Sequence, residues 1–203
     1  MEKSSSNNSL EAWAEYVGAA SACVRGVAVT LADGTPIEVS DGFLRWIALA
    51  REGRDAGHRM HFIGNGASAM MASHFAADAC KNAGLSAMAF NDASLLTAIG
   101  NDISFEEIFA LPLRQLARPG DLVVAISSSG NSPNVIRALD VARSLPAKIV
   151  TLSGKRVDNQ ARARGDLNFY VAADRYGWVE CAHQLILHYW LDQYLNLHGD
   201  GAV

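Results

Sequence analysis

From residue 58 onward, short apolar segments alternate with longer segments of helical periodicity, and this alternation restricts the fold more than any other feature. Strands are expected at 58–64, 85–90, 121–127, 147–153 and 167–172. Helices are expected at 67–82, 104–117, 132–144, 157–164 and 178–197, with Pro112 kinking or dividing the second of them. Strands that alternate with helices form parallel sheets covered on both faces. The pattern therefore predicts an α/β protein, a three-layer αβα sandwich with a parallel sheet of about five strands.

The N-terminal segment has a purely helical pattern. Apolar residues recur at helical spacing from Leu10 to Leu31, which predicts one long helix ended by the turn "ADGTP". A second helix is expected at about 40–56, and the polar residues 1–8 are expected to form a flexible end. We expect a single domain over 9–203, with a helical segment at 9–57 and an αβα core at 58–203.

Composition excludes several classes of function. The formal net charge is −4, and the segment "KRVDNQARAR" (155–164) spreads its cations in the manner of a solvated helix face, so no nucleic-acid partner is expected. No apolar run reaches the roughly 18 residues of a membrane span, and the N-terminus lacks the apolar core of a signal peptide. We expect no membrane association and a cytoplasmic location. Cys23, Cys80 and Cys181 lie in apolar-periodic segments and are expected to be buried free thiols.

The last helix is apolar around most of its circumference, more than packing on one sheet face requires. Together with the apolar stripe of the first helix, this indicates a homo-oligomer. A fully internal last helix is the alternative.

Two polar turns follow predicted strands. "GNGAS" (64–68) supplies Gly64 and Gly66, which permit close backbone approach, and donors at Asn65 and Ser68. "SSSGNSP" (127–133) supplies the hydroxyls of Ser127, Ser128, Ser129 and Ser132, with Ser132 placed as a helix N-cap and Pro133 at the first helical position. Helix N-termini at the carboxyl edge of a parallel sheet bind anions. Neither turn matches a Walker or GxGxxG pattern, and the pair predicts a phosphate site, most simply for a sugar phosphate.

Ionisable residues stand at helical spacing on two helices. His74 and Asp78 are four residues apart, and Glu180, Gln184 and His188 form a second stripe, with His183 beside Glu180. A His and a carboxylate from each helix suit a divalent metal such as zinc, or paired acid–base catalysis. The alternative is that these residues are ordinary surface pairs at i, i+4 spacing. Glu180 and His188 lie about 12 Å apart along an ideal helix axis, so one metal reaches both only if their side chains converge.

The segments "HFIGNGASAMMASHFAADA", "TAIGND", "ISSSGNSPNVI" and "IVTLSGK" resemble the sugar isomerase (SIS) domain, and within it the phosphoheptose isomerase group. The resemblance covers roughly 10–197. It implies the isomerisation of sedoheptulose 7-phosphate to D-glycero-D-manno-heptose 7-phosphate through an enediol, for bacterial heptose biosynthesis. It also implies a zinc ion in each active site and a homotetramer with active sites at subunit interfaces.

By motif, the resemblance assigns roles to individual residues. Phosphate binding falls to Ser68, Ser127, Ser129 and Ser132, assisted by Asn65 and Ser128, with Gly66 beside them. Sugar contacts fall to Asn101 and Asp102. The zinc ligands would be His74, Asp78, Glu180 and His188, with Glu180 also facing the substrate. Asp78 and His188 would be the acid–base pair.

The chain departs from the family pattern at several positions. Asp78 stands where the family usually has Glu, and Glu180 where it usually has Gln; family residues are also replaced at Lys81, Asn82, Gly177 and Trp178. An isomerase of another sugar phosphate therefore stays open. A non-catalytic SIS protein of the replication-initiator-associating type shares "HFAA" and "LTAIxND" but lacks the catalytic carboxylate and the last-helix His. Because Asp78 and His188 are both present, we favour an enzyme.

Overall fold

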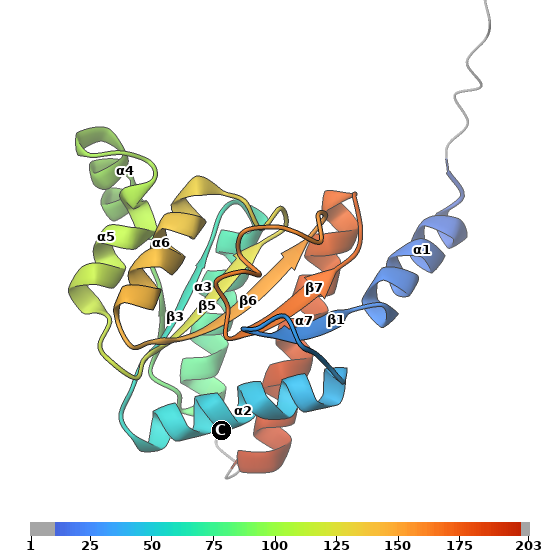
Figure 1. Cartoon of the computed structure of the whole chain (residues 1–203), viewed down its shortest axis with the longest axis horizontal. Coiled ribbons are helices and arrows are strands. Elements are labelled where there is room, and N and C mark those ends of the chain that lie inside the picture. The colour runs from blue at the N-terminus through green and yellow to red at the C-terminus, as the bar shows by residue number, and fades with distance from the viewer. Residues whose placement is uncertain (1–10, 200–203) are drawn as a thin grey trace, which may run out of the picture.

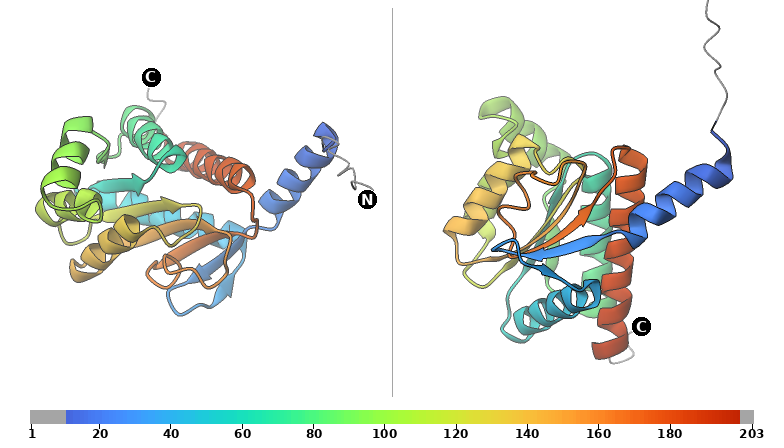
Figure 2. Two further views of the ribbon diagram at one scale, coloured as in Figure 1. Left: turned by 90° about the horizontal axis from the view of Figure 1, so that it is seen from above. Right: turned by 45° about the vertical axis from the view of Figure 1, so that its right-hand side comes forward.

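In the computed structural model, which describes residues 11–199, a twisted sheet lies between two layers of helices (Figures 1 and 2). The sheet has seven strands in the order β2-β1-β7-β6-β5-β3-β4. These are β1 (Ala28–Leu31), β2 (Pro36–Ile37), β3 (Met60–Gly64), β4 (Ala87–Ala89), β5 (Leu122–Ser127), β6 (Lys148–Gly154) and β7 (Leu167–Val171). The strands β3 to β7 are parallel, and β1 and β2 form a hairpin that pairs antiparallel with β7. The predicted sandwich is confirmed, and its five strands are the parallel ones.

The helices are α1 (Trp13–Arg25), α2 (Val39–Asp55), α3 (Ala67–Ala83), α4 (Ala93–Asp102), α5 (Glu107–Leu116), α6 (Pro133–Ser144) and α7 (Tyr176–His198). One face of the sheet is covered by α2, α3 and α7, and the other by α4, α5 and α6 (Figure 1). Successive strand residues alternate between the two cores: Phe62 and Val124 face α3 and α7, whereas Ile63 and Val123 face α5 and α6.

The helix predicted from Leu10 to Leu31 is wrong after Arg25. The start of that prediction lies outside the described residues; α1 ends at Arg25, and β1 begins at Ala28. Gly26 caps α1, and the β-branched Val29 and Thr30 then pair with β7. Helical spacing at the junction was coincidental, because pairing with a sheet edge outweighed local periodicity.

One helix was not predicted, and one predicted helix is absent. The segment 93–102 forms α4, whose first turn is capped by the Asp92 carboxylate, which accepts a hydrogen bond of 2.9 Å from the Leu95 N–H. Residues 157–164 form turns and no helix, so the cations of 155–164 do not share a helix face. Asn159 holds this loop instead: its side chain donates to the Ser153 hydroxyl (3.1 Å) and to the Arg156 carbonyl (2.8 Å).

The cysteines are free, as expected, but they are not buried: Cys23 is partly exposed, and Cys80 and Cys181 are exposed. Cys23 packs against the edge of the core, whereas Cys80 and Cys181 lie on the solvent side of α3 and α7. Within the described part of the chain, no helix has both the length and the hydropathy of a membrane span. The expected flexible end at 1–8 and both limits of the domain predicted at 9–203 lie outside the described residues.

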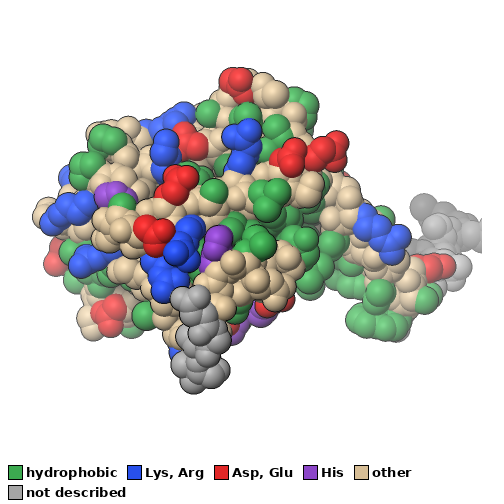
Figure 3. Space-filling model, turned by 90° about the horizontal axis from the view of Figure 1, so that it is seen from below, with side chains coloured by type: hydrophobic (Ala, Val, Ile, Leu, Met, Phe, Trp, Pro, Cys, Tyr) green, Lys and Arg blue, Asp and Glu red, His purple; other side chains and the backbone are tan. Residues whose placement is uncertain are grey.

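The helix α1 projects from the sandwich and packs mainly against α7 (Figure 2). None of its residues is buried, and Trp13 is 76% exposed. On α7, Leu185 is 52% and Tyr189 46% exposed, so this helix is not fully internal within one chain. Figure 3 shows hydrophobic side chains on the projecting helix and over the adjoining face of the body.

Candidate active site

The two predicted anion-binding turns meet at the carboxyl edge of the sheet. β3 and β5 are parallel neighbours whose last residues lie side by side, with Gly64 opposite Ile126. β4 flanks β3 on one side, while β6 and β7 extend the sheet beyond β5 on the other. The point between β3 and β5 is therefore the topological switch point, where ligands bind in open α/β sheets.

Glycines shape the first turn. A Cβ at Gly64 would lie 2.7 Å from both the Ile126 carbonyl oxygen and the Ser68 Cβ, so only glycine fits. Gly66 is the N-cap of α3 and has a φ of 56°, a left-handed conformation that favours glycine. The N-terminus of α3 is thus brought directly against the end of β5.

The second turn folds around its serines. Ser132 is the N-cap of α6, and its side chain makes no capping hydrogen bond. The Ser127 hydroxyl accepts from the Gly130 N–H (3.2 Å) and lies 3.4 Å from the Ser132 hydroxyl. The Ser129 hydroxyl accepts from the Asn131 N–H (3.2 Å). These contacts fix the loop while leaving hydroxyl hydrogens for a ligand.

An amide pair joins the two turns. The side chains of Asn65 and Asn134 exchange two hydrogen bonds, each of 2.8 Å. Asn134 also accepts from the Val135 N–H (3.0 Å) and is buried. The start of α3 and the start of α6 are consequently held at a fixed separation.

These turns enclose a polar cavity of about 160 Å³, which we call the serine cavity. It is lined by Asn65, Ser68, Ile126, Ser127, Ser128, Ser129, Ser132, Tyr176 and Glu180. All seven of the lining residues other than Ile126 and Tyr176 were expected from the sequence. Tyr176 was missed because α7 was predicted to begin two residues later than it does; a helix N-terminus facing the same sheet edge is the signal that would have located it.

Two predicted sugar contacts do not join the cavity. Asn101 and Asp102 lie exposed at the C-terminal end of α4, where the Asn101 side chain donates to the Asp102 carboxylate (2.8 Å). Within one chain they are separate from the serine cavity lining.

A second group of predicted residues meets where α3 packs on α7; we call His74, Asp78 and His188 the histidine cluster. His74 Nε2 lies 3.3 Å from Asp78 Oδ2. The ring centroids of His74 and His188 are 5.8 Å apart, and Phe75 packs against His188 at 4.8 Å. Gln184 Nε2 contacts His188 Nε2 at 3.0 Å, which orients the imidazole on α7. The arrangement offers an imidazole and a carboxylate beside each other, suited to proton transfer.

The four predicted zinc ligands do not converge in this conformation. Glu180 lines the serine cavity, about 12 Å from His188 along the helix axis. Among residues 11–199, no three His, Cys, Asp or Glu side chains stand close enough together to hold a metal. The donor types of the histidine cluster suit zinc, but ligation requires side-chain movement or a further ligand.

His183, which the sequence places beside Glu180, belongs to the core. It is fully buried, and its Nε2 donates to the Ser153 carbonyl (3.2 Å). Burial lowers the pKa of His183 to about 4, so the ring is neutral at pH 7. Because Ser153 on β6 pairs with Ser127 on β5, this bond fixes α7 against the strands that carry the serine cavity.

The comparisons with known proteins agree with this geometry. The SIS domain family profile matches residues 40–154. The chain is 39% identical over 153 residues to the phosphoheptose isomerase of Bordetella avium, covering 71% of this chain and 75% of that protein. It is 38% identical over 163 residues to that of Nitratidesulfovibrio vulgaris, covering 77% and 76%.

Solved structures show the same likeness. The phosphoheptose isomerase from Neisseria gonorrhoeae aligns with a TM-score of 0.78 and 29% identity over 90% of this chain and 96% of that chain. The phosphoheptose isomerase from Francisella tularensis aligns with a TM-score of 0.78 and 22% identity over the same shares of the two chains, a likeness of fold.

Proposed function

The chain belongs to the SIS domain family, and from this premise we propose that it is a phosphoheptose isomerase that converts sedoheptulose 7-phosphate into D-glycero-D-manno-heptose 7-phosphate. The observation that carries the proposal is the pairing of a hydroxyl-rich cavity at the switch point with a histidine cluster two helical turns further along α7. This spacing fits a substrate whose phosphate and carbonyl lie at opposite ends of its carbon chain.

The serine cavity would bind the phosphate. Ser68, Ser127, Ser129 and Ser132 present hydroxyls around it, and Asn65 and Ser128 add polar groups. The free N–H groups at the starts of α3 and α6 point to the same edge of the sheet, where the helix dipoles favour an anion. These contacts hold the phosphate equally in substrate and transition state, so they serve binding and placement.

The histidine cluster would move the proton. In the conversion of ketose to aldose, a base removes a proton from C1, the enediol forms, and an acid delivers a proton to C2 while the hydroxyl proton moves from O1 to O2. We assign these steps to Asp78 and His188, which come from facing helices. His74 holds the Asp78 carboxylate, and Gln184 holds His188. Both reacting groups are thereby oriented before substrate arrives.

We propose zinc as the cofactor, one ion in each site, with His74, Asp78, Glu180 and His188 as the residues that would hold it. Two imidazoles and two carboxylates are donors that zinc prefers. Bound there, zinc would polarise the substrate carbonyl. The separation of Glu180 from the histidine cluster means that its carboxylate would have to turn along α7 to join the other three.

We further propose a cytoplasmic homotetramer with active sites at subunit interfaces. The exposed apolar residues of α1 and α7 support association, because a projecting helix with Trp13 in water is poorly stable alone. His74 has 48% of its side chain exposed, which leaves room for residues of another subunit to complete the site. Asn101 and Asp102, remote from the serine cavity of their own chain, are candidates for that role.

The test is phosphorus and proton NMR of sedoheptulose 7-phosphate incubated with the purified protein, first after chelation and then after zinc is returned. We expect an aldoheptose 7-phosphate signal only with zinc. Conversion that is equal in both conditions would remove the metal from the proposal. No conversion in either, by a folded oligomer, would favour another sugar phosphate or a binding role.

A further inference from the structure

The backbone of Lys155 adopts a conformation that lysine rarely takes. Its φ is 58°, and it is the one non-glycine residue with positive φ among residues 11–199. It follows Gly154, the last residue of β6, where a Cβ would lie 3.1 Å from the Ser128 carbonyl oxygen. The Tyr170 hydroxyl donates to the Lys155 carbonyl (2.6 Å). The fold thus holds Lys155 in a strained turn immediately beside the serine loop, as residues at functional sites often are.

The side chain of Lys155 reaches a residue of the serine cavity. Its Nζ lies 3.1 Å from the centroid of the Tyr176 ring, and Tyr176 lines the cavity at the start of α7. Lys155 forms no ion pair with a carboxylate in the described part of the chain. Its ammonium is therefore placed at the edge of the cavity by an aromatic ring, an interaction that is weak enough to be exchanged for an anion.

The serine cavity itself lacks a cation. Its lining contains no Lys, Arg or His, and it includes the carboxyl group of Glu180. A phosphate monoester carries close to two negative charges at neutral pH, which neutral hydroxyls balance only in part. The other cation near the start of α7 is engaged elsewhere: the Arg175 guanidinium lies 4.5 Å from the Trp178 ring and pairs with Glu11.

We propose that Lys155 is the residue that neutralises the substrate phosphate, and that Tyr176 holds its ammonium ready at the edge of the serine cavity. This rests on the proposed function, because the phosphate is that of the sugar-phosphate substrate. On phosphate entry, the ammonium turns from the ring to the anion and forms a charge-assisted hydrogen bond. Lys155 is a binding residue here, and it takes no part in the proton transfer.

The test compares Lys155→Gln with Lys155→Arg, and with Lys148→Gln as a matched control that removes an exposed lysine at the opposite end of β6. Two readouts are used: steady-state kinetics with sedoheptulose 7-phosphate, and calorimetric titration with inorganic phosphate. For Lys155→Gln we expect KM and the phosphate Kd to rise about tenfold with kcat little changed, as loss of one charge-assisted bond implies. Lys155→Arg should recover most of the affinity, and Lys148→Gln should match wild type.

A second variant separates binding from folding. Lys155→Gly relieves the left-handed strain, so its Tm should equal or exceed that of wild type while its phosphate affinity falls as in Lys155→Gln. The proposal would be overturned if Lys155→Gln kept the wild-type phosphate affinity. It would also be overturned if Lys148→Gln lost as much phosphate affinity as Lys155→Gln. If wild type binds phosphate through Lys155 but converts no sedoheptulose 7-phosphate, the proposed function fails and the cation site stands. If wild type binds no phosphate, both fail.

Discussion

The side-chain amides of Asn65 and Asn134 form a closed pair, each donating to the other at 2.8 Å, although the two residues are 69 positions apart in the chain. One lies in the turn after β3 and the other in the first turn of α6. The pair therefore converts two independent local turns into one binding site, and its geometry sets how far apart the two helix N-termini stand.

Replacing one asparagine of this pair should lower the free energy of unfolding more than replacing both. Asn134→Leu leaves the Asn65 amide without its partner, and we expect the free energy of unfolding to fall by about 1–3 kcal/mol. The double variant with Asn65→Leu should recover part of this loss, because no side-chain amide is then left without its partner. Full recovery is not expected, since the Val135 N–H also loses its acceptor.

Urea denaturation of the two single variants and the double variant measures the coupling directly. Strictly additive losses would show that the amide pair does not join the turns energetically. KM for the sugar phosphate should rise in every variant, because Asn65 lines the serine cavity.

Most of the fold could be predicted from the sequence, since the five parallel strands are apolar runs whose signal is local. The predicted elements that proved wrong lie in segments whose structure depends on contacts with residues elsewhere in the sequence. The strand Ala28–Leu31 exists because β7 offers an edge, and the loop at 157–164 because Asn159 bonds Ser153. Neither partner is visible in the local periodicity.

The site divides in the same way. The serine cavity could be predicted because each turn carries its own glycines, serines and capping residues. The contact between Lys155 and Tyr176 could not, since it joins residues 21 apart across a strand and a helix start. His183 looked like a site residue by spacing, and only packing against Ser153 assigns it to the core.

His188→Ala should abolish turnover while leaving the assembly intact. The imidazole is partly exposed and packs on Phe75, so its loss removes the proton-transferring group without emptying the core. His198→Ala, at the end of the same helix, is the control and should keep wild-type kcat. The measurement is kcat together with the elution volume of the oligomer; wild-type turnover in His188→Ala would remove this residue from the mechanism.

Ser129→Ala should raise KM with little change in kcat, because a phosphate contact stabilises substrate and transition state alike. Loss of one hydrogen bond to a charged group implies an increase of about ten- to hundredfold. Ser144→Ala, on the far end of α6, serves as the control. Steady-state kinetics decide the matter, and a variant that lost kcat at unchanged KM would contradict the assignment of Ser129 to the phosphate.

Trp13→Asp should weaken the oligomer. Trp13 is 76% exposed on a helix with no buried residue, so an apolar contact with another subunit is what would stabilise it. Light scattering coupled to size exclusion should show a smaller species than wild type at equal concentration. Val157→Asp, also at a largely exposed apolar residue but in the loop after β6, is the control that should leave the mass unchanged. Equal masses for Trp13→Asp and wild type would exclude α1 from the interface.

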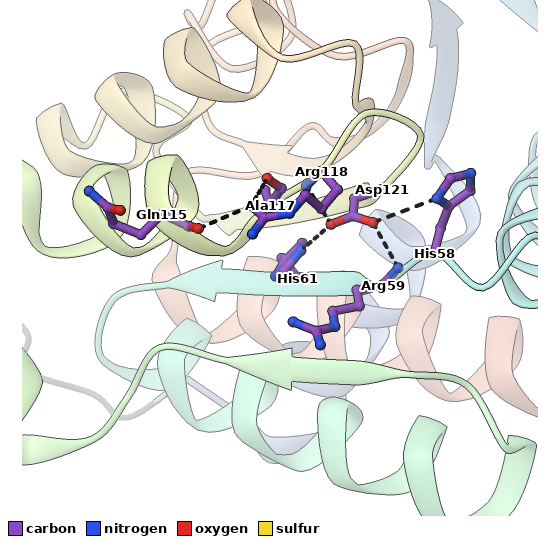
Figure 4. A network of polar contacts seen from close by, with 7 residues as sticks. All are labelled: His58, Arg59, His61, Gln115, Ala117, Arg118 and Asp121. Carbon is purple, nitrogen blue, oxygen red and sulfur yellow. Dashed lines mark hydrogen bonds and ion pairs between the residues drawn. The ribbon is translucent and has the colours of Figure 1, made fainter.

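Acid should destabilise the fold through His61 and Asp121, which lie 2.8 Å apart at the opposite edge of the sheet from the serine cavity (Figure 4). Burial lowers the pKa of His61 below 6.5 and outweighs the nearby carboxylate. Burial alone would raise the pKa of Asp121, but hydrogen bonds from the Arg59 N–H, His61 and the Arg118 N–H hold it below 3.8. In both groups the unfolded chain binds protons more readily, so stability falls as the pH drops.

The loss from His61 begins below pH 6.5, and that from Asp121 below pH 3.8. His61→Phe removes the loss that is due to His61. At pH 7 we expect this variant to be less stable than wild type by about 1–3 kcal/mol, because Asp121 loses a buried donor. Between pH 7 and 5, however, it should lose less stability than wild type. His58→Gln, at a half-exposed ring 3.9 Å from Asp121, should keep the wild-type difference. Urea denaturation at the two pH values checks this, and an unchanged difference in His61→Phe would mean that another group governs the acid sensitivity.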